Sequence, residues 1–64
     1  MMINTMNKDE IKALRVSMGL TQKQFAEKLI VSLFTVYRWE KGISKPNPIY
    51  QKKLFALRER NDKR

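Results

Sequence analysis

The sequence contains no cysteine and no histidine. These absences exclude a disulfide framework and the usual zinc sites, and we expect no metal and no cofactor. The chain also lacks a long unbroken apolar run and a basic leader, so we predict neither a membrane span nor a signal peptide. A reducing, cytoplasmic environment fits this composition.

Acidic residues are scarce. Fourteen Lys and Arg residues stand against six Asp and Glu residues, which gives a formal net charge of +8 at pH 7. Such a charge attracts polyanions, nucleic acid first and an acidic membrane surface second. We expect no membrane binding, because the apolar helix faces are needed for the core.

The length limits the domain organisation. With 64 residues, of which 42% are hydrophobic, the chain suits a single folded domain over residues 1–64. A domain of this size buries only about 60% of its unfolded surface, so the core is thin. We expect an ordered core at about 7–59, a flexible N-terminal arm and a flexible charged tail.

The features of an enzyme are missing. No Gly-rich phosphate loop is followed by lysine, and the acidic residues are scattered among basic ones. We therefore expect no catalysis. A single domain of this size also leaves no separate site for a small-molecule ligand.

Two capping sequences open the first two helices. Residues 7–10 have the pattern of a capping box, in which Asn7 accepts from a free amide and Glu10 reaches back. Gly19 ends this helix as a left-handed cap, and residues 21–24 repeat the capping pattern. Helical spacing predicts these inward residues: Ile11, Leu14, Met18, Phe25, Ala26 and Leu29.

Two more helices follow. Ser32 is the expected cap of a third helix at about 33–41, which turns Val36 and Trp39 inward and ends at Gly42. A tight connection over residues 30–32 joins it to the second helix. Pro48 suits the first position of a fourth helix at about 48–59. The apolar residues of that helix are Ile49, Leu54, Ala56 and Leu57.

Residues 29–37 also allow a different interpretation. They are rich in β-branched and aromatic side chains, so propensity alone favours a strand. However, no other segment offers this strand a partner, and a lone strand leaves its backbone unpaired. We therefore predict two helices and a tight turn in this region.

The spacing of one set of residues is specific when it is taken as a whole: Arg15, Gly19, Leu20, Thr21, Gln22, Phe25, Ala26, Leu29, Val31, Ser32, Thr35, Val36, Trp39, Glu40, Gly42 and Pro46. In these residues the chain resembles the phage-repressor and Cro-type helix-turn-helix family, also called the xenobiotic-response-element family. The resemblance covers about residues 11–57. It implies an all-α bundle of four or five helices that binds DNA as a transcriptional regulator.

The chain departs from this family at two points. Ile30 occupies the turn position where the family usually has glycine. A left-handed backbone there costs a β-branched residue roughly 1–2 kcal/mol, so we expect a differently bent connection or a less stable domain. Many relatives also dimerise through a fifth helix or a separate domain, whereas this chain stops just after the fourth helix.

The outward side of the third helix carries the candidates for reading bases. The fork of Arg38 matches the O6 and N7 acceptors of guanine. Leu33 and Phe34 suit either thymine methyl groups or a protein surface, and Tyr37 suits either a DNA contact or packing beside the core. The full base-reading set is Ser32, Leu33, Phe34, Tyr37 and Arg38.

A second set is expected to contact phosphates. Gln22 resembles the family residue that holds a phosphate at the amino end of the second helix, where free amides assist. The others lie near that end, on the third helix or in the following loop. The set is Gln22, Lys23, Thr35, Lys41, Ser44 and Lys45.

The resemblance gives a structural role to two charged residues. It pairs Arg15 of the first helix with Glu40 at the end of the third in a partly buried ion pair. Trp39 is expected to belong to the core.

Two functions remain open from the sequence. The first is a repressor that binds double-stranded DNA, acting as a homodimer on a two-fold symmetric operator. The second is a protein-interaction module, resembling antitoxin-like or coactivator-like relatives, in which Leu33, Phe34 and Tyr37 form the docking patch.

Overall fold

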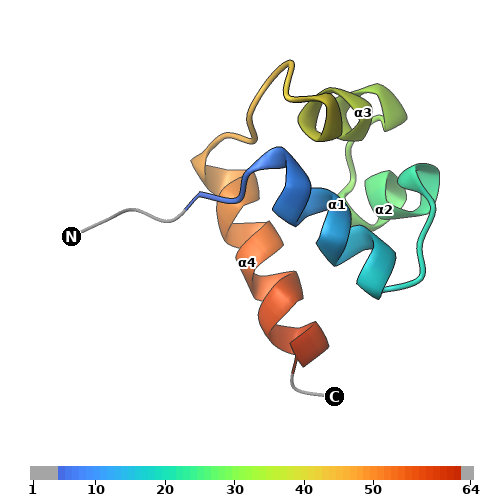
Figure 1. Ribbon diagram of the computed structural model, residues 1–64, viewed down its shortest axis with the longest axis vertical. Coiled ribbons are helices and arrows are strands. Elements are labelled where there is room, and N and C mark those ends of the chain that lie inside the picture. Colours follow the sequence, from blue (N-terminus) through green and yellow to red (C-terminus); the bar gives the residue numbers. More distant parts are fainter. Residues whose placement is uncertain (1–4, 63–64) are drawn as a thin grey trace.

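The computed structural model describes residues 5–62, and within them the chain forms four α-helices (Figure 1). The helices are α1 Lys8–Ser17, α2 Gln22–Leu29, α3 Leu33–Lys41 and α4 Pro48–Asp62. The prediction of an all-α fold is confirmed. The alternative strand interpretation of residues 29–37 is wrong, because most of that segment is α3. The expected flexibility of residues 1–4 and 63–64 concerns positions outside the described range.

The first two helices begin with the predicted capping boxes. The Glu10 amide donates to Asn7 Oδ1 (2.8 Å), and the Asn7 amide donates to Glu10 Oε1 (3.0 Å). Thr21 and Gln24 make the same reciprocal pair at α2, at 3.1 and 2.9 Å. Each box satisfies two amides that a helix leaves free.

The last two helices also begin as predicted. Ser32 Oγ accepts from the Thr35 amide (3.1 Å) at the start of α3. Asn47 Oδ1 accepts from the Tyr50 amide (2.9 Å), and Pro48 is the first residue of α4. The sequence therefore marks the starting point of all four described helices.

Three turns have a left-handed residue. Gly19 (φ 73°) and Gly42 (φ 77°) follow α1 and α3, as predicted. Ile30 (φ 60°, ψ 50°) follows α2, where its amide donates to the Glu27 carbonyl (3.2 Å) and the Val31 amide to the Ala26 carbonyl (3.0 Å). The expectation of a differently bent connection is wrong. The chain makes the same turn that a glycine would make, although the left-handed backbone is unfavourable for isoleucine.

The core lies between α1, α2, α3 and the first half of α4. The largest side chains that are fully buried are Phe25, Ile11, Leu54 and Val36. Trp39 is buried as well, and its ring lies 5.8 Å from that of Tyr50. The inward residues predicted for the first three helices are buried, except that Met18 is half-buried.

Helix α4 has an inward face that the sequence did not assign, and it ends later than expected. Of its apolar residues, Leu54 is buried and Leu57 is half-buried, whereas Ile49 is 65% exposed and Ala56 is exposed. Gln51 is also buried. The helix also continues past residue 59 to Asp62. Asn61 Nδ2 donates to Ser17 Oγ (3.0 Å), which attaches the last turn of α4 to the end of α1.

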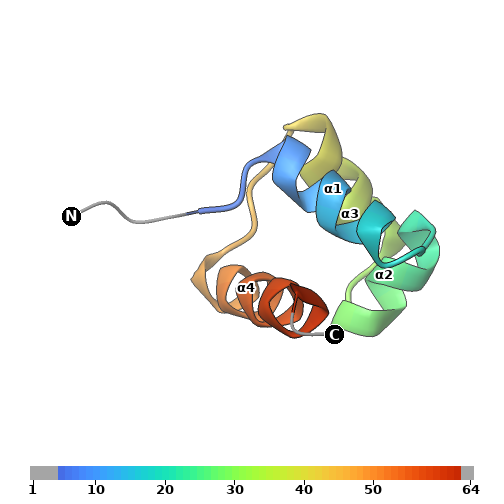
Figure 2. The ribbon, with the colours of Figure 1, turned by 60° about the horizontal axis from the view of Figure 1, so that its bottom comes forward.

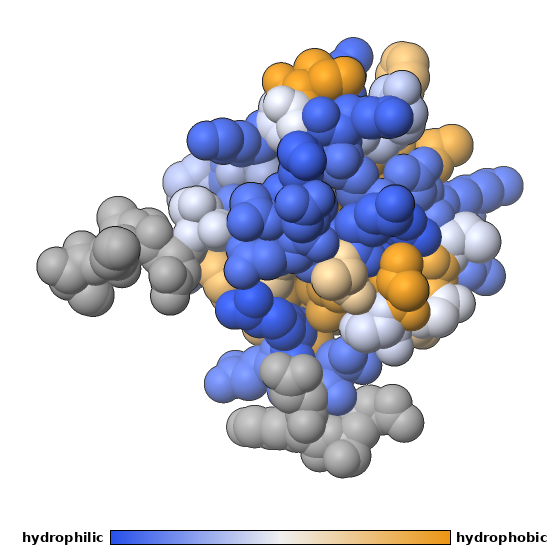
Figure 3. Space-filling view, in the orientation of Figure 1, coloured by the Kyte–Doolittle hydropathy of each residue, from blue (hydrophilic) through white to orange (hydrophobic). Residues whose placement is uncertain are grey.

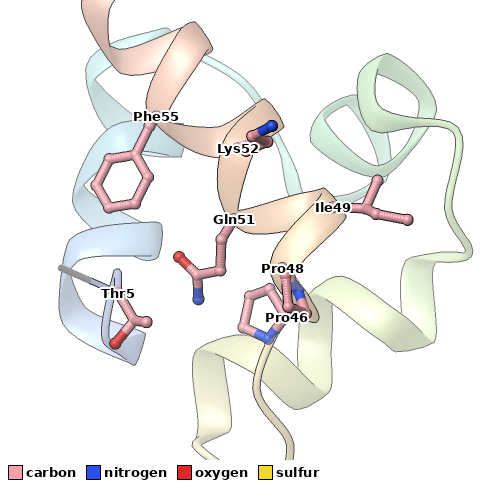
Figure 4. Close-up of a pocket in the computed structure, with 7 residues that line it drawn as sticks. All are labelled: Thr5, Pro46, Pro48, Ile49, Gln51, Lys52 and Phe55. Carbon is pink, nitrogen blue, oxygen red and sulfur yellow. The ribbon is translucent and has the colours of Figure 1, made fainter. Parts of the chain in front are cut away.

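The N-terminal segment joins the core one residue before the expected boundary. Met6 is 2% exposed, and its amide donates to Oε1 of the buried Gln51 (3.0 Å). Figure 4 shows Gln51 projecting from α4 between Thr5 and Pro46. A hollow of about 550 Å³ lies beside it, lined by Thr5, Pro46, Pro48, Ile49, Gln51, Lys52 and Phe55. This buried amide therefore attaches residues 5–6 to α4.

The arrangement leaves α3 along one edge of the molecule. In Figure 1, α3 lies at the top of the molecule and the C-terminal half of α4 at the bottom, with α1 between them in that view, and in Figure 2 α4 again lies below α1 and α3. Figure 3 shows a mainly hydrophilic surface on which apolar residues form separate small areas. One long side of α3 is therefore free of the rest of the chain.

Candidate nucleic-acid interface

Helix α3 has two distinct faces. Val36 and Trp39 point into the core, with exposures of 0% and 4%. On the other face Leu33 is 48%, Phe34 64% and Tyr37 38% exposed. A helix with one buried face presents its other side chains together. The outward set predicted from the sequence therefore lies on the surface and is not enclosed by the fold.

Aromatic rings and cations alternate along this outward face. The guanidinium carbon of Arg38 lies 5.1 Å from the centre of the Phe34 ring, and Lys41 Nζ lies 5.7 Å from that of Tyr37. The two rings are 6.3 Å apart. Each cation is four residues after its ring, so the pairs follow one helical turn. Cation–π attraction favours both pairs, and the cationic side chains partly cover the rings.

An ion pair between α1 and α3 fixes the rear of this helix. Arg15 Nε lies 2.7 Å and Arg15 Nη2 3.1 Å from the two Glu40 oxygens. The side chains are only 14% and 5% exposed. Arg15 Nη1 also donates to the Leu20 carbonyl (2.9 Å). The family resemblance implied a partly buried ion pair between these residues. The contact is in addition bidentate, and it joins α1 to the end of α3.

Glu40 also holds the side chain at the start of α2. Gln22 Nε2 donates to Glu40 Oε1 (3.0 Å), and Gln22 is half-buried. The amide nitrogen carries two hydrogens, and this bond uses one of them. The contact brings the amino end of α2, with the candidate phosphate residue Gln22, beside the end of α3 that carries Glu40.

The remaining candidates lie at both ends of α3 and beyond. Ser32 and Thr35 stand at its start, with their hydroxyl oxygens 3.0 Å apart. Thr35 is half-buried, and Ser32 is exposed. The exposed candidates Lys23, Lys41, Ser44 and Lys45 lie in the first turn of α2, at the end of α3 and in the loop after it. Five of these six candidates thus lie at an end of α3 or in the loop after it, and Lys23 lies on α2.

Some features of this surface were not predicted. The stacking of Arg38 on Phe34 could have been found from their four-residue spacing. The Gln22–Glu40 bond joins residues 18 positions apart and has no local signal. Ile43 lies next to the end of α3 and is 67% exposed, but no sequence pattern marked it.

The described residues offer little for other kinds of site. In residues 5–62, no group of three or more His, Cys, Asp or Glu side chains is arranged to hold a metal ion. Over the same range, none of the helices combines the length and the apolar content needed to cross a bilayer.

Comparison with known proteins assigns the family. A family model described as helix-turn-helix matches residues 11–56, which is most of the chain. The chain belongs to the Cro/C1-type helix-turn-helix family. In this family context α2 and α3 are the two helices of the motif, and the family consists of DNA-binding transcription regulators. No curated protein and no solved structure matches the chain significantly.

Proposed function

We propose that this chain is a sequence-specific repressor that inserts α3 into the major groove of double-stranded DNA. The main support is the outward face of α3, which carries Phe34, Tyr37, Arg38 and Lys41 while its opposite face is buried. A major groove is wide enough for one α-helix. The net charge of +8 adds a long-range attraction to the phosphates.

In this proposal, different outward side chains contact different groups of the bases. Arg38 donates to O6 and N7 of a guanine, which is worth about 1–3 kcal/mol of discrimination. Leu33 and Phe34 contact thymine methyl groups, while Ser32 and Tyr37 supply hydroxyl groups. The exposure of these side chains supports the assignment, because burial in the chain's own core would prevent it.

The phosphate contacts flank this face. Gln22 and the free amides at the start of α2 bind one phosphate, and the bond to Glu40 holds the Gln22 side chain in place for it. The other contacts come from Lys23, Thr35, Lys41, Ser44 and Lys45. These contacts position the protein on the duplex and do not select a sequence.

A homodimer on a two-fold symmetric operator completes the proposal. One copy of α3 covers only a few base pairs, and two copies about 34 Å apart read half-sites one turn of DNA apart. Repression follows when the occupied operator overlaps a promoter.

One observation favours a second candidate function. Leu33, Phe34 and Tyr37 are apolar or aromatic and exposed, which also suits a protein docking patch. Binding to a protein through this patch would depend little on salt. Binding to DNA weakens steeply with salt, because phosphates release counterions.

The test is a binding titration with selected and random duplexes at two salt concentrations. The proposal predicts tighter binding to the selected duplex and a steep loss of affinity for both at the higher salt. Equal affinity for both duplexes would contradict sequence-specific binding. A stoichiometric protein complex that is indifferent to salt would favour the docking function instead.

A further inference from the structure

Phe34 and Arg38 form one unit on the outward face of α3. They are one helical turn apart, and the guanidinium carbon lies 5.1 Å from the ring centre. Phe34 is 64% exposed, so its ring contributes little to the core. The contact that the ring does make is with the guanidinium of Arg38.

This contact limits the freedom of the arginine. A free arginine side chain samples many rotamers, and ordering it on DNA has an entropic cost. The planar guanidinium stacks on an aromatic face and keeps its donors available at its edge. An arginine held in this way is ordered in part before it meets a base, which favours binding.

The same ring has a second task at the groove. One helical turn advances 5.4 Å and one base step about 3.4 Å, so side chains four residues apart meet base pairs one or two steps apart. The only apolar group that bases present in the major groove is the thymine 5-methyl group. A phenyl ring next to a guanine-reading arginine therefore fits a thymine at a neighbouring step.

We propose that Phe34 is a positioning residue for Arg38, and that the pair selects duplexes in which thymine lies within two steps of the guanine that Arg38 reads. The inference rests on the proposed function of α3. It adds a substrate class, a guanine with a nearby thymine, and it predicts that the two recognition events are energetically coupled.

The chain offers a matched control pair away from this face. On α4 the guanidinium carbon of Arg58 lies 4.9 Å from the centre of the Phe55 ring. This pair has the same chemistry, and its half of α4 lies on the opposite side of the molecule from α3 (Figure 1). R58K therefore reports the effect of weakening such a pair without touching the proposed reading face. F55L reports it together with a loss of packing, because Phe55 packs against the core.

The experiment measures the affinity of the full chain for a duplex selected from a random pool. Two modified versions of that duplex replace single groups. One carries 7-deazaguanine, which removes N7, and the other carries deoxyuridine in place of thymine, which removes the methyl group. Each is measured with the wild type, F34L, R38K and the two α4 controls. Thermal unfolding of F34L is expected to match the wild type, because Phe34 is exposed.

For the wild type we expect about a ten-fold loss on removal of N7 and about a four-fold loss on removal of the methyl group. In F34L the loss on removal of N7 falls to about three-fold, because the arginine is no longer held by a ring. The α4 controls retain the wild-type losses.

The outcomes separate the inference from the proposed function. Equal losses on removal of N7 in the wild type and F34L would overturn the positioning role of Phe34. Unchanged affinity for the deoxyuridine duplex would overturn the thymine preference. In both cases specific DNA binding would stand. Failure to bind any duplex would overturn the proposed function together with this inference.

Discussion

Ile30 has a left-handed backbone (φ 60°, ψ 50°) and a side chain that is 80% exposed. Left-handed geometry costs a β-branched residue roughly 1–2 kcal/mol, and an exposed side chain recovers little of this by packing. The turn persists because the Schellman-type bonds of Ile30 and Val31 and the burial of the neighbouring Leu29 require it. The strain at Ile30 therefore lowers the stability of the domain, and removing it is expected to raise that stability.

The substitution Ile30→Gly is expected to raise the free energy of unfolding by about 1 kcal/mol. Glycine removes the left-handed penalty, and its greater freedom in the unfolded chain offsets part of the gain. Urea unfolding followed by circular dichroism measures the change. Gly42→Ala is the reverse control: a Cβ there would meet Lys8 Cδ at 3.0 Å in a left-handed position, so stability falls. A less stable Ile30→Gly variant would contradict this account of the turn.

The Arg15–Glu40 pair gives a second prediction at this scale. Arg15→Ala is expected to cost about 3 kcal/mol, because it leaves the 5% exposed Glu40 carboxylate without its bidentate partner. The double variant Arg15→Met with Glu40→Leu removes both charges and is expected to be more stable than Arg15→Ala. Unfolding midpoints in urea decide between them. If the double variant is less stable than both the wild type and Arg15→Ala, the ion pair itself, and not the avoidance of an unpaired charge, is what stabilises the protein at this position.

The third prediction at the scale of single residues concerns Gln51. Gln51→Met keeps the length of the side chain but leaves the buried Met6 amide without its acceptor, at a cost of about 1–3 kcal/mol. Lys52→Met, at an exposed position of the same helix, is the control and changes stability little. Equal stability of the two variants would mean that the Met6 bond is not needed to hold the N-terminal segment.

At the scale of the helices, α3 should carry the sequence preference and its flanks the general affinity. Arg38→Ala is expected to reduce the preference for a selected over a random duplex by about 1–3 kcal/mol. Lys45→Ala is expected to weaken binding to both duplexes to a similar extent. Titrations of both variants with both duplexes test this. An Arg38→Ala variant that loses affinity equally on all sequences would refute the role given to Arg38.

The helices themselves were largely predictable, because their signals are local. At the start of each helix, a side-chain oxygen accepts a hydrogen bond from the amide three residues later, and such a pattern can be recognised in the sequence. The capping residues are Asn7, Thr21, Ser32 and Asn47. The strand propensity of residues 29–37 was overridden because α3 buries Val36 and Trp39 in the core, a tertiary effect.

The failures have a physical reason too. The inward face of α4 was not assigned, because one of its buried residues is an amide, Gln51, whose partner Met6 is 45 residues away. The end of α4 was placed too early because the Asn61–Ser17 bond also joins distant positions. Distant hydrogen bonds leave no periodic trace in a sequence.

The candidate site also has a part that could be predicted from the sequence and a part that could not. Its outward residues followed from the inward ones, because a helix with a known buried face has a known exposed face. The bond from Gln22 to Glu40 needed coordinates. The contact of Arg38 with Phe34 could have been anticipated from their spacing, but its distance could not. Their binding roles remain predictions.

At the scale of the whole molecule, the charge of +8 attracts DNA, and the number of phosphates contacted sets the dependence of affinity on salt. If each copy contacts about four phosphates, the plot of log affinity against log salt has a slope of about −4 for each copy bound, and about twice that for a dimer. Lys45→Ala is expected to reduce the size of this slope by about one. Titrations at several salt concentrations measure it. A slope near zero would contradict phosphate binding and favour the protein-docking function.

The account depends most on the outward face of α3 being the surface that meets DNA. Amide and side-chain chemical shifts of the isotope-labelled protein, recorded during titration with a selected duplex, test this residue by residue. We predict the largest changes at Leu33, Phe34, Tyr37, Arg38 and Lys41 and at the amino end of α2, with little change in the second half of α4. Saturable binding whose shift changes are confined to α4 or to the segment before α1 would contradict it.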